Sequence, residues 1–177
     1  MMSEDALLTV AKLMELSART APKAVGKDFI EVKILTDEQK DALGRKMLSI
    51  GEEGNSPGYN RDGQNVLDSA VVILIGLLEH PGLGIDCRAC GFERCKAMEA
   101  AKIQGDFLGP NCAHRLADLG IAVGSAVKTA GMHNVDNRVM ERAGLAARRL
   151  GVIKSNIAYG IPLSATGKSI FFDRKPI

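Results

Sequence analysis

The stretch Ala70-Val-Val-Ile-Leu-Ile-Gly76 decides the fold class of this chain of 177 residues. It carries no polar side chain and is rich in β-branched residues, which is typical of a strand buried on both faces. Such a strand lies in the middle of a sheet, and other elements have to cover that sheet on both sides. The sequence before and after this stretch should therefore supply further strands and amphipathic helices.

The sequence before the central strand predicts two helices and one more strand. Residues 3–20 carry apolar side chains at helical spacing. Residues 29–35 alternate between apolar and charged side chains, which indicates a half-buried strand. Residues 36–39, Thr-Asp-Glu-Gln, have the form of a capping box, so a helix should run from there to about residue 50. Residues 51–65 are rich in Gly, Asn, Ser and Asp and predict a loop.

The sequence after the central strand predicts three helices and a last strand. Pro110 suits the first position of the second of these helices. A strand at residues 120–127 is an alternative to part of that helix, because this stretch is rich in small and β-branched residues. The expected helices cover residues 92–104, 110–130 and 137–150, and the expected strand covers residues 152–161. We therefore expect one α/β (α+β) domain over residues 1–177, with a sheet flanked by helices.

Composition and charge narrow the classes of function. Hydrophobic residues make up 46% of the chain and charged residues 25%, which is typical of a folded globular protein. The net charge is only +2 without a basic block, which argues against a nucleic-acid partner. The first residues do not resemble a signal peptide, and the longest apolar run, residues 70–78, is too short for a membrane span. We expect a cytoplasmic protein without a membrane partner, whose thiols stay reduced.

All four cysteines lie in one irregular segment, residues 82–112, with the spacing C-x2-C-x4-C-x16-C. Four thiolates are the ligand set of a [4Fe–4S] cluster, with one thiolate for each iron. Two of the cysteines fall in the first turns of expected helices, where partial positive charge favours the thiolate. We therefore predict one [4Fe–4S] cluster and a role in electron transfer. The expected ligands are Cys87, Cys90, Cys95 and Cys112.

Two alternatives to a cluster with four cysteine ligands remain open. A structural zinc site also takes four cysteines, but usually as two separated C-x2-C pairs, and this chain has one such pair. A zinc-stabilised module without redox activity is therefore an alternative function. His114 could replace one cysteine as a ligand, although four thiolates form a complete set without it.

The cysteine segment resembles the four-cysteine cluster module of anaerobic corrinoid iron–sulfur proteins and related redox regulators. In both, a C-x2-C-G-x3-C run precedes an Ala/Met-rich helix and a distant fourth cysteine. The whole chain looks like the uncharacterised prokaryotic family of ferredoxin-domain proteins. The residues that carry the first likeness are Cys87, Cys90, Gly91, Cys95, Met98 and residues 100–101.

A second likeness covers most of the chain. The stretch Leu16-Ser-Ala-Arg-Thr-Ala-Pro-Lys-Ala24 resembles the opening of nitroreductase-like FMN flavoproteins, and Ile157-Ala-Tyr-Gly-Ile-Pro162 resembles their closing strand. This likeness implies their fold, with the cysteine segment as an insertion before the central helix at residues 112–130. It also implies a homodimer with FMN at a two-fold interface. Lys23 and Gly26 depart from the family, which often has Ser and Asn there.

Three basic residues are candidates for contact with an FMN phosphate, namely Arg19, Lys168 and Arg174. A guanidinium group suits phosphate oxygens, although Arg19 could equally be a solvated side chain near a helix end. The corresponding function is an FMN-dependent reductase fed by the cluster, so enzymatic activity remains open. The sequence around Lys168 lacks the full spacing of a nucleotide P-loop, and the chain contains no recognisable catalytic dyad or triad.

The residues around the cysteines are charged, and charged side chains are rarely buried without partners. We therefore expect the cluster to lie near the surface, where an electron donor or acceptor protein could dock under charge steering. The alternative is that the positive side chains only neutralise an anionic cluster. The residues concerned are Arg88, Glu93, Arg94 and Lys96.

Overall fold

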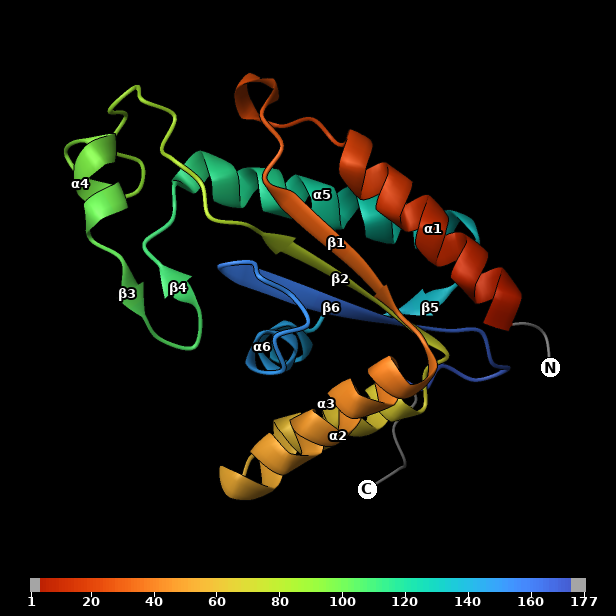
Figure 1. The fold of residues 1–177 in the computed structure, drawn as a ribbon. Coiled ribbons are helices and arrows are strands. Elements are labelled where there is room, and N and C mark those ends of the chain that lie inside the picture. The colour runs from red at the N-terminus through yellow and green to blue at the C-terminus, as the bar shows by residue number, and fades with distance from the viewer. Residues whose placement is uncertain (1–3, 173–177) are drawn as a thin grey trace.

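The computed structural model describes residues 4–172, which form a four-stranded sheet, helices on both of its faces and a lobe at one end (Figure 1). The helices are α1 (Glu4–Thr20), α2 (Asp37–Glu53), α3 (Pro57–Leu67), α4 (Cys95–Ala100), α5 (Ala113–Met132) and α6 (Glu141–Arg149), with a 3-10 turn, η1, at Ala24–Gly26. The strands are β1 (Ile30–Leu35), β2 (Val71–Leu77), β3 (Ile103–Gln104), β4 (Leu108–Gly109), β5 (Asp136–Asn137) and β6 (Ile157–Ser164).

The strand predicted to be central is central. The sheet has the order β1-β2-β6-β5, and β2 pairs antiparallel with β1 on one side and β6 on the other. Ile73 lies opposite Ile34 and Ile161 in this register. All residues of β2 are buried, as the apolar run at residues 70–76 indicated. Successive side chains of β2 point to opposite faces of the sheet and so enter two separate cores.

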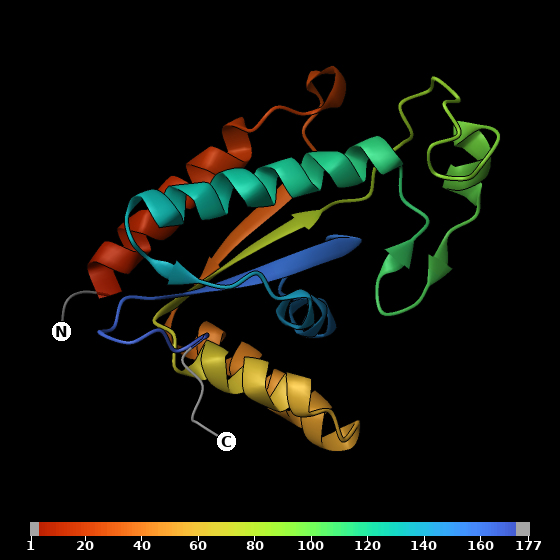
Figure 2. The same cartoon turned by 180° about the vertical axis from the view of Figure 1, so that it is seen from behind.

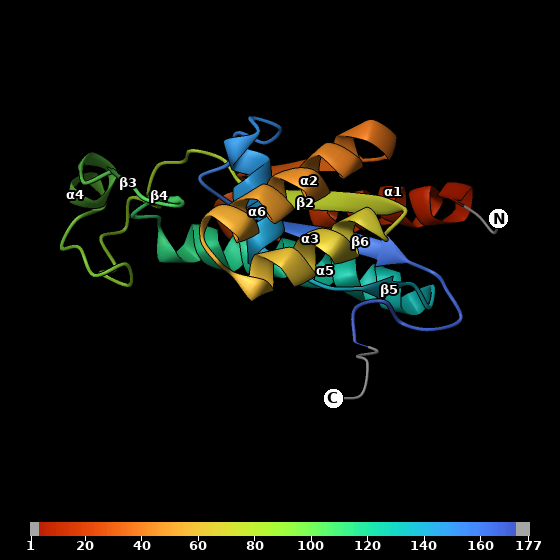
Figure 3. The ribbon, with the colours of Figure 1, turned by 90° about the horizontal axis from the view of Figure 1, so that it is seen from below.

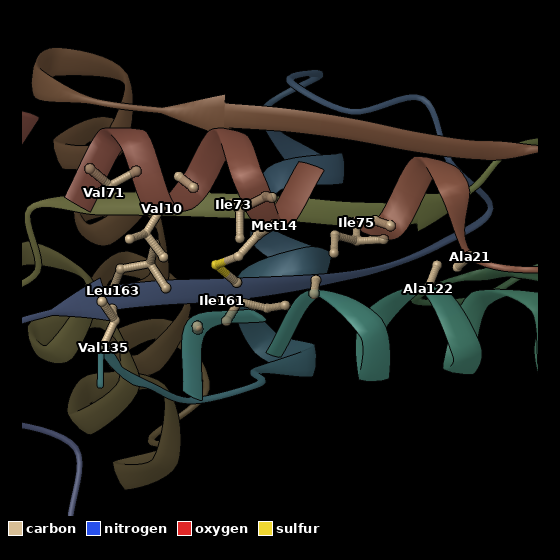
Figure 4. Close-up of a cluster of buried hydrophobic side chains, with 14 of the residues drawn as sticks. Val10, Met14, Ala21, Val71, Ile73, Ile75, Ala122, Val135, Ile161 and Leu163 are labelled. Carbon is tan, nitrogen blue, oxygen red and sulfur yellow. The ribbon is translucent and has the colours of Figure 1, made fainter. Parts of the chain in front are cut away.

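One face of the sheet is covered by α1 and α5, which also pack against each other (Figure 2). Ile73 and Ile75 of β2 meet Met14 of α1 in this core (Figure 4). Alanines such as Ala11 and Ala126 are fully buried between the layers. Their small side chains let the two helices lie close to the sheet and to each other, because little volume separates the backbones.

The other face is covered by α2, α3 and α6 (Figure 3). Helix α6 approaches β6 so closely that a Cβ atom on Gly144 would lie 1.8 Å from the carbonyl oxygen of Ala158. Asp62 of α3 is buried and accepts a hydrogen bond of 3.0 Å from Nη1 of Arg142 on α6. A glycine contact and an ion pair to a buried carboxylate therefore fix the position of α6.

The loop expected at residues 51–65 is the main error of the sequence-based prediction. Helix α2 continues to Glu53, and most of the remaining residues belong to α3. Two of the glycines that suggested a loop, Gly51 and Gly63, are contact points between these helices. A Cβ atom on Gly63 would lie 3.1 Å from Cβ of Met47, and one on Gly44 would lie 2.7 Å from the side chain of Leu67. Close helix packing, rather than a turn, accounts for them.

Several expected boundaries also differ from the structure. Thr36 precedes α2 without a side-chain capping hydrogen bond, so the capping box at residues 36–39 is wrong. Only Cys95–Ala100 of the helix expected at residues 92–104 is helical. Helix α5 begins after Pro110 rather than at it, and it includes residues 120–127, so the alternative strand is wrong. The last strand runs from Ile157 to Ser164, later than residues 152–161.

Within residues 4–172 the structure contains no helix that is long and apolar enough to cross a membrane.

The substitution Gly144→Ala should destabilise the fold by about 1–3 kcal/mol or more, because the new methyl group collides with the backbone of β6. Urea denaturation of both proteins measures this difference. Gly167→Ala is the control, since a Cβ atom there has no atom within 4 Å and the substitution should change stability little. Equal midpoints for Gly144→Ala and the unmodified protein would contradict the close packing of α6 on β6.

Candidate metal centre

The cysteine lobe, defined here as residues 82–112, projects from the end of the sheet and contains α4 and the β3–β4 hairpin (Figure 1). It joins β2 to α5, so its last residues lie at the amino end of the long central helix (Figure 2). All four cysteines of the chain are in this lobe, and none of them forms a disulfide. Four free thiols are therefore gathered in one small unit of the structure.

The backbone turns sharply around the first cysteines. Gly84 and Gly91 have φ angles of +79° and +85°, in the left-handed region that glycine adopts without strain. Asp86 and Arg88, on either side of Cys87, also have positive φ angles, of 46° and 62°. Non-glycine residues rarely adopt this conformation, and its concentration here marks a segment under local constraint.

Two carboxylates close the lobe on itself. Oδ1 of Asp86 accepts a hydrogen bond of 2.8 Å from the backbone N–H of Cys95, and Oε1 of Glu99 accepts one of 2.8 Å from Gly82. The Cys95 hydrogen bond lowers the pKa of Asp86. The hydrogen bond from Gly82, followed by that from Lys96, lowers the pKa of Glu99. Both side chains are therefore held ionised beside the thiols.

The cysteines lie at two places on the lobe. Cys112 caps the amino end of α5 and is buried, whereas Cys87 is exposed and its Sγ lies 3.6 Å from Nε2 of His114 on the same helix. Cys95 is the first residue of α4 and packs on Gly82, where a Cβ atom would lie 2.7 Å from Cβ of Cys95. Cys90 is half-buried. Cys87 and Cys112 thus meet the same helix terminus.

The donor set has the number and kind of ligands that an iron–sulfur cluster requires. Among the described residues, no three His, Cys, Asp or Glu side chains are placed to hold one metal ion. A [4Fe–4S] cluster has a different requirement, because each thiolate binds its own iron and the sulfur atoms stay farther apart. Four free thiols around glycine turns meet that requirement in number and in chemistry. The assignment of the individual ligands stays a prediction.

The base of the lobe contains a buried polar network that the sequence analysis missed. Nε2 of His80 lies 3.1 Å from Oδ1 of Asn111, and Nδ2 of Asn156 donates to the same oxygen at 3.2 Å. All three residues are buried. None of the three belongs to a recognisable motif, and their partners are 31 or 45 positions away in the sequence. The only local signal was the position of His80 and Asn111 at the two ends of the cysteine segment.

The far end of the lobe is fastened to α6. Nη2 of Arg149 lies 3.0 Å from Oδ1 of Asp106, and Nη1 of Arg148 donates to the Asp106 carbonyl oxygen at 2.8 Å. The Arg148 guanidinium also lies over the ring of Phe107, 5.7 Å from its centre. The lobe is thus attached to the rest of the molecule at its base and at its hairpin.

Arg115 and Asp118 of α5 form a buried ion pair of 3.0 Å that was also not predicted. Nη1 of Arg115 donates to the carbonyl oxygens of Ala24 and Lys27, and Oδ1 of Asp118 accepts from the N–H of Ala24. The pair therefore holds the segment after the Ala-Pro sequence against the start of the central helix. An Arg and an Asp three residues apart on the apolar face of a helix were the available signal.

The two candidate flavin residues that the structure describes, Arg19 and Lys168, are not brought together in one chain. Nη1 of Arg19 donates to Oδ2 of Asp28 and to the carbonyl oxygen of Ile30, both at 2.7 Å. Ile30 pairs with Leu77, which pairs with Ile157, so Arg19 lies near the start of β6. Lys168 is exposed in the segment after the end of β6. Arg174 lies outside the described residues.

Two solved structures are similar to this chain in fold. The FMN-dependent nitroreductase NfnB from Mycobacterium smegmatis has a TM-score of 0.60 at 10% identity, over 96% of this chain and 84% of that one. A nitroreductase-like family protein from Bacillus cereus has a TM-score of 0.59 at 12% identity, over 91% and 75%. The nitroreductase-like fold implied by the sequence is therefore confirmed. At these identities the likeness concerns the fold alone.

Two further comparisons concern the sequence. A protein of Archaeoglobus fulgidus is 45% identical over 167 residues, which are 94% of this chain and 90% of that protein. Residues 108–174 match the family described as "Uncharacterized protein containing a ferredoxin domain (DUF2148)". That region contains Cys112, and the other three cysteines precede it. By these matches, the chain belongs to the ferredoxin-domain family that this description names.

Proposed function

We propose that the protein binds one [4Fe–4S] cluster through Cys87, Cys90, Cys95 and Cys112 and transfers electrons between partner proteins in the cytoplasm. The observation that carries this proposal is the presence of all four thiols, free of disulfides, on one projecting lobe. Membership of a family described by a ferredoxin domain supports an iron–sulfur redox role. A bound cluster would supply the capacity to accept and release single electrons.

The residues around the thiols support this binding in different ways. The N-terminal turns of α4 and α5 present partial positive charge at Cys95 and Cys112, which would stabilise an anionic cluster bound there. Asp86 holds the backbone of Cys95 in place. Gly82 leaves room beside Cys95 that any side chain would fill. The chain thus combines ligands with a backbone shaped to hold them.

Exposure of the lobe supports a protein partner. Cys87 is exposed, so an approaching redox protein could come close to that edge of the cluster. Arg88, Arg94 and Lys96 are exposed beside the thiols, whereas Asp86 and Glu99 are engaged by backbone hydrogen bonds. Glu93 is exposed there as well, and Lys96 pairs with Glu99 at 3.2 Å. Arg88 and Arg94 are therefore the positive charges offered for docking, which suits a donor with an acidic surface.

An FMN-dependent reductase fed by the cluster is the second candidate, and the fold likeness to an FMN-dependent nitroreductase favours it. Arg19 and Lys168 lie at opposite ends of β6, whose eight residues span about 25 Å. One phosphate could contact both side chains only between two copies of the chain. Arg174 remains a candidate for the same contact. Release of flavin on denaturation of the purified protein would support this function.

The outer face of α5 supports a homodimer. Leu116 and Ile121 are exposed on this helix, with exposed fractions of 37% and 44%. Gly120 and Gly124 lie on the same face, and a Cβ atom on either would have no atom within 4 Å. An apolar face without side-chain cover on a central helix would pack well against its own copy across a two-fold axis.

Replacement of any one of the four cysteines by serine should lower the iron and sulfide content of anaerobically purified protein, since a thiolate ligand is lost. Colorimetric iron and sulfide assays, together with the absorption spectrum, measure this. Ala89→Ser is the matched control, because it adds a hydroxyl group to the same exposed segment and keeps every thiol. Full iron and sulfide in the four serine variants would refute the ligand assignment. One zinc per chain without sulfide would support the zinc-stabilised module instead.

Ile121→Asp should convert a dimer into a monomer, because it places a charge in the proposed apolar interface. Light scattering at micromolar concentration measures the mass of both proteins. Ile103→Asp is the control, since Ile103 is 72% exposed on the lobe hairpin, away from α5. A monomeric unmodified protein would count against the dimer and against a flavin site shared by two subunits.

Electron transfer from a reduced ferredoxin- or flavodoxin-type donor with an acidic surface should slow as ionic strength rises. Arg88→Glu and Arg94→Glu should slow it further in stopped-flow absorption measurements. Arg45→Glu makes the same charge change at an exposed site on α2, outside the lobe, and should have little effect. If neither salt nor charge reversal on the lobe alters the rate, these positive side chains serve only to neutralise the cluster.

A further inference from the structure

His80 lies between the sheet and the cysteine lobe and is only 4% exposed. It follows β2 closely in the chain, and its ring packs edge-on against Phe29 at a centroid distance of 6.2 Å. Nδ1 lies 3.2 Å from the carbonyl oxygen of Pro81, and Nε2 lies 3.1 Å from Oδ1 of Asn111. Both ring nitrogens therefore face oxygen atoms.

The neighbours of Asn111 fix which of its atoms faces the histidine. Nδ2 of Asn111 donates to the carbonyl oxygen of Leu108 at 2.8 Å, and a carbonyl oxygen can only accept. Oδ1 of Asn111 therefore points to His80, and it also accepts from Nδ2 of Asn156. The Pro81 carbonyl oxygen is likewise only an acceptor. A neutral imidazole has one N–H for these two acceptors, whereas an imidazolium has two.

Charged groups of both signs surround the ring. Lys102 and Arg115 act against a positive charge on His80, and Glu79 and Glu99 line an open pocket beside it together with Lys102. Burial lowers the pKa of His80 below its ordinary value, and the hydrogen bonds to Pro81 and Asn111 oppose this effect. At neutral pH the ring is therefore neutral, and one nitrogen faces an oxygen without a proton between them.

His80 is close to two proposed ligands without touching either. Gly82, two residues along the chain, packs directly on Cys95. Asn111, which faces Nε2, precedes Cys112. A negative charge added near these thiols would stabilise a proton on His80, because charges interact strongly where water is excluded.

We propose that His80 takes up a proton when an electron enters the cysteine lobe, a role that rests on the cluster proposed above. The electron comes from a reduced partner protein and stays on the cluster. The proton comes from solvent, through the pocket lined by Glu79 and Glu99, and forms an N–H bond at the bare ring nitrogen. Each transferred electron is thus balanced by one proton, and the acceptor for the new N–H group is already in place.

The test is the midpoint potential of the anaerobically purified protein, measured spectroelectrochemically across about pH 5 to 8, where histidine titrates. The potential should fall by about 59 mV for each tenfold drop in proton concentration over part of this range. His80→Gln should remove this dependence while iron and sulfide contents remain. His133→Gln changes a histidine at the carboxyl end of α5, the end opposite to Cys112, and should keep it.

A second variant tests the same idea without removing the histidine. Asn111→Asp places a negative charge against Nε2, so the pH-dependent range should move to higher pH. If Asn111 only positioned Cys112, Asn111→Asp would give no such shift. This variant therefore tests the role of His80 even if His80→Gln fails to fold. A potential independent of pH in the unmodified protein, or a slope that persists in His80→Gln, would overturn the role of His80. Absence of iron and sulfide from the unmodified protein would instead overturn the cluster itself.

Discussion

The burial of β2 on both faces is the constraint on which the rest of the structure depends. A strand without a polar position cannot leave either face to water, because each exposed Val, Leu or Ile would forgo about 1.5–3 kcal/mol of burial free energy. Two helical layers are therefore required, α1 with α5 on one side and α2, α3 and α6 on the other. The same strand ends at Leu77, so its position determines where the cysteine lobe begins.

Sequence patterns predicted the elements whose side chains repeat at regular intervals. Strand β1 and helix α1 are of this kind, because one buried face leaves a periodic apolar signal. Strand β2 gave a different signal, a continuous apolar run, because both of its faces are buried. Helix α3 was missed since Gly63 serves a contact with α2 and Gly58 lies against Arg142 of α6, and both glycines resemble loop residues in isolation. A close approach between two helices depends on both sequences together, and a local pattern does not contain it.

The same distinction between local patterns and contacts of distant segments applies to the candidate site. Spacing within one segment located the cysteines, because the ligands of a cluster can be close in sequence. The residues that support the site come from distant parts of the sequence, so spacing within one segment could not locate them. Arg115 binds the backbone of Ala24, 91 positions earlier, and His80 meets Asn111, 31 positions later. Lone polar residues acquire partners only when the fold is complete, so their roles depend on tertiary structure rather than on motif.

Asn156 joins the end of β2, just before the lobe, to β4 within the lobe. Its N–H donates to the carbonyl oxygen of Leu77 at 2.6 Å, and its own carbonyl oxygen accepts from Leu108 at 3.1 Å. A segment that leaves and re-enters a fold at nearby positions can be gained or lost as a unit, because the elements on either side, here β2 and α5, keep their course. For protein engineering, this makes the junction a natural place to exchange one cofactor-binding loop for another while the four-stranded sheet is retained.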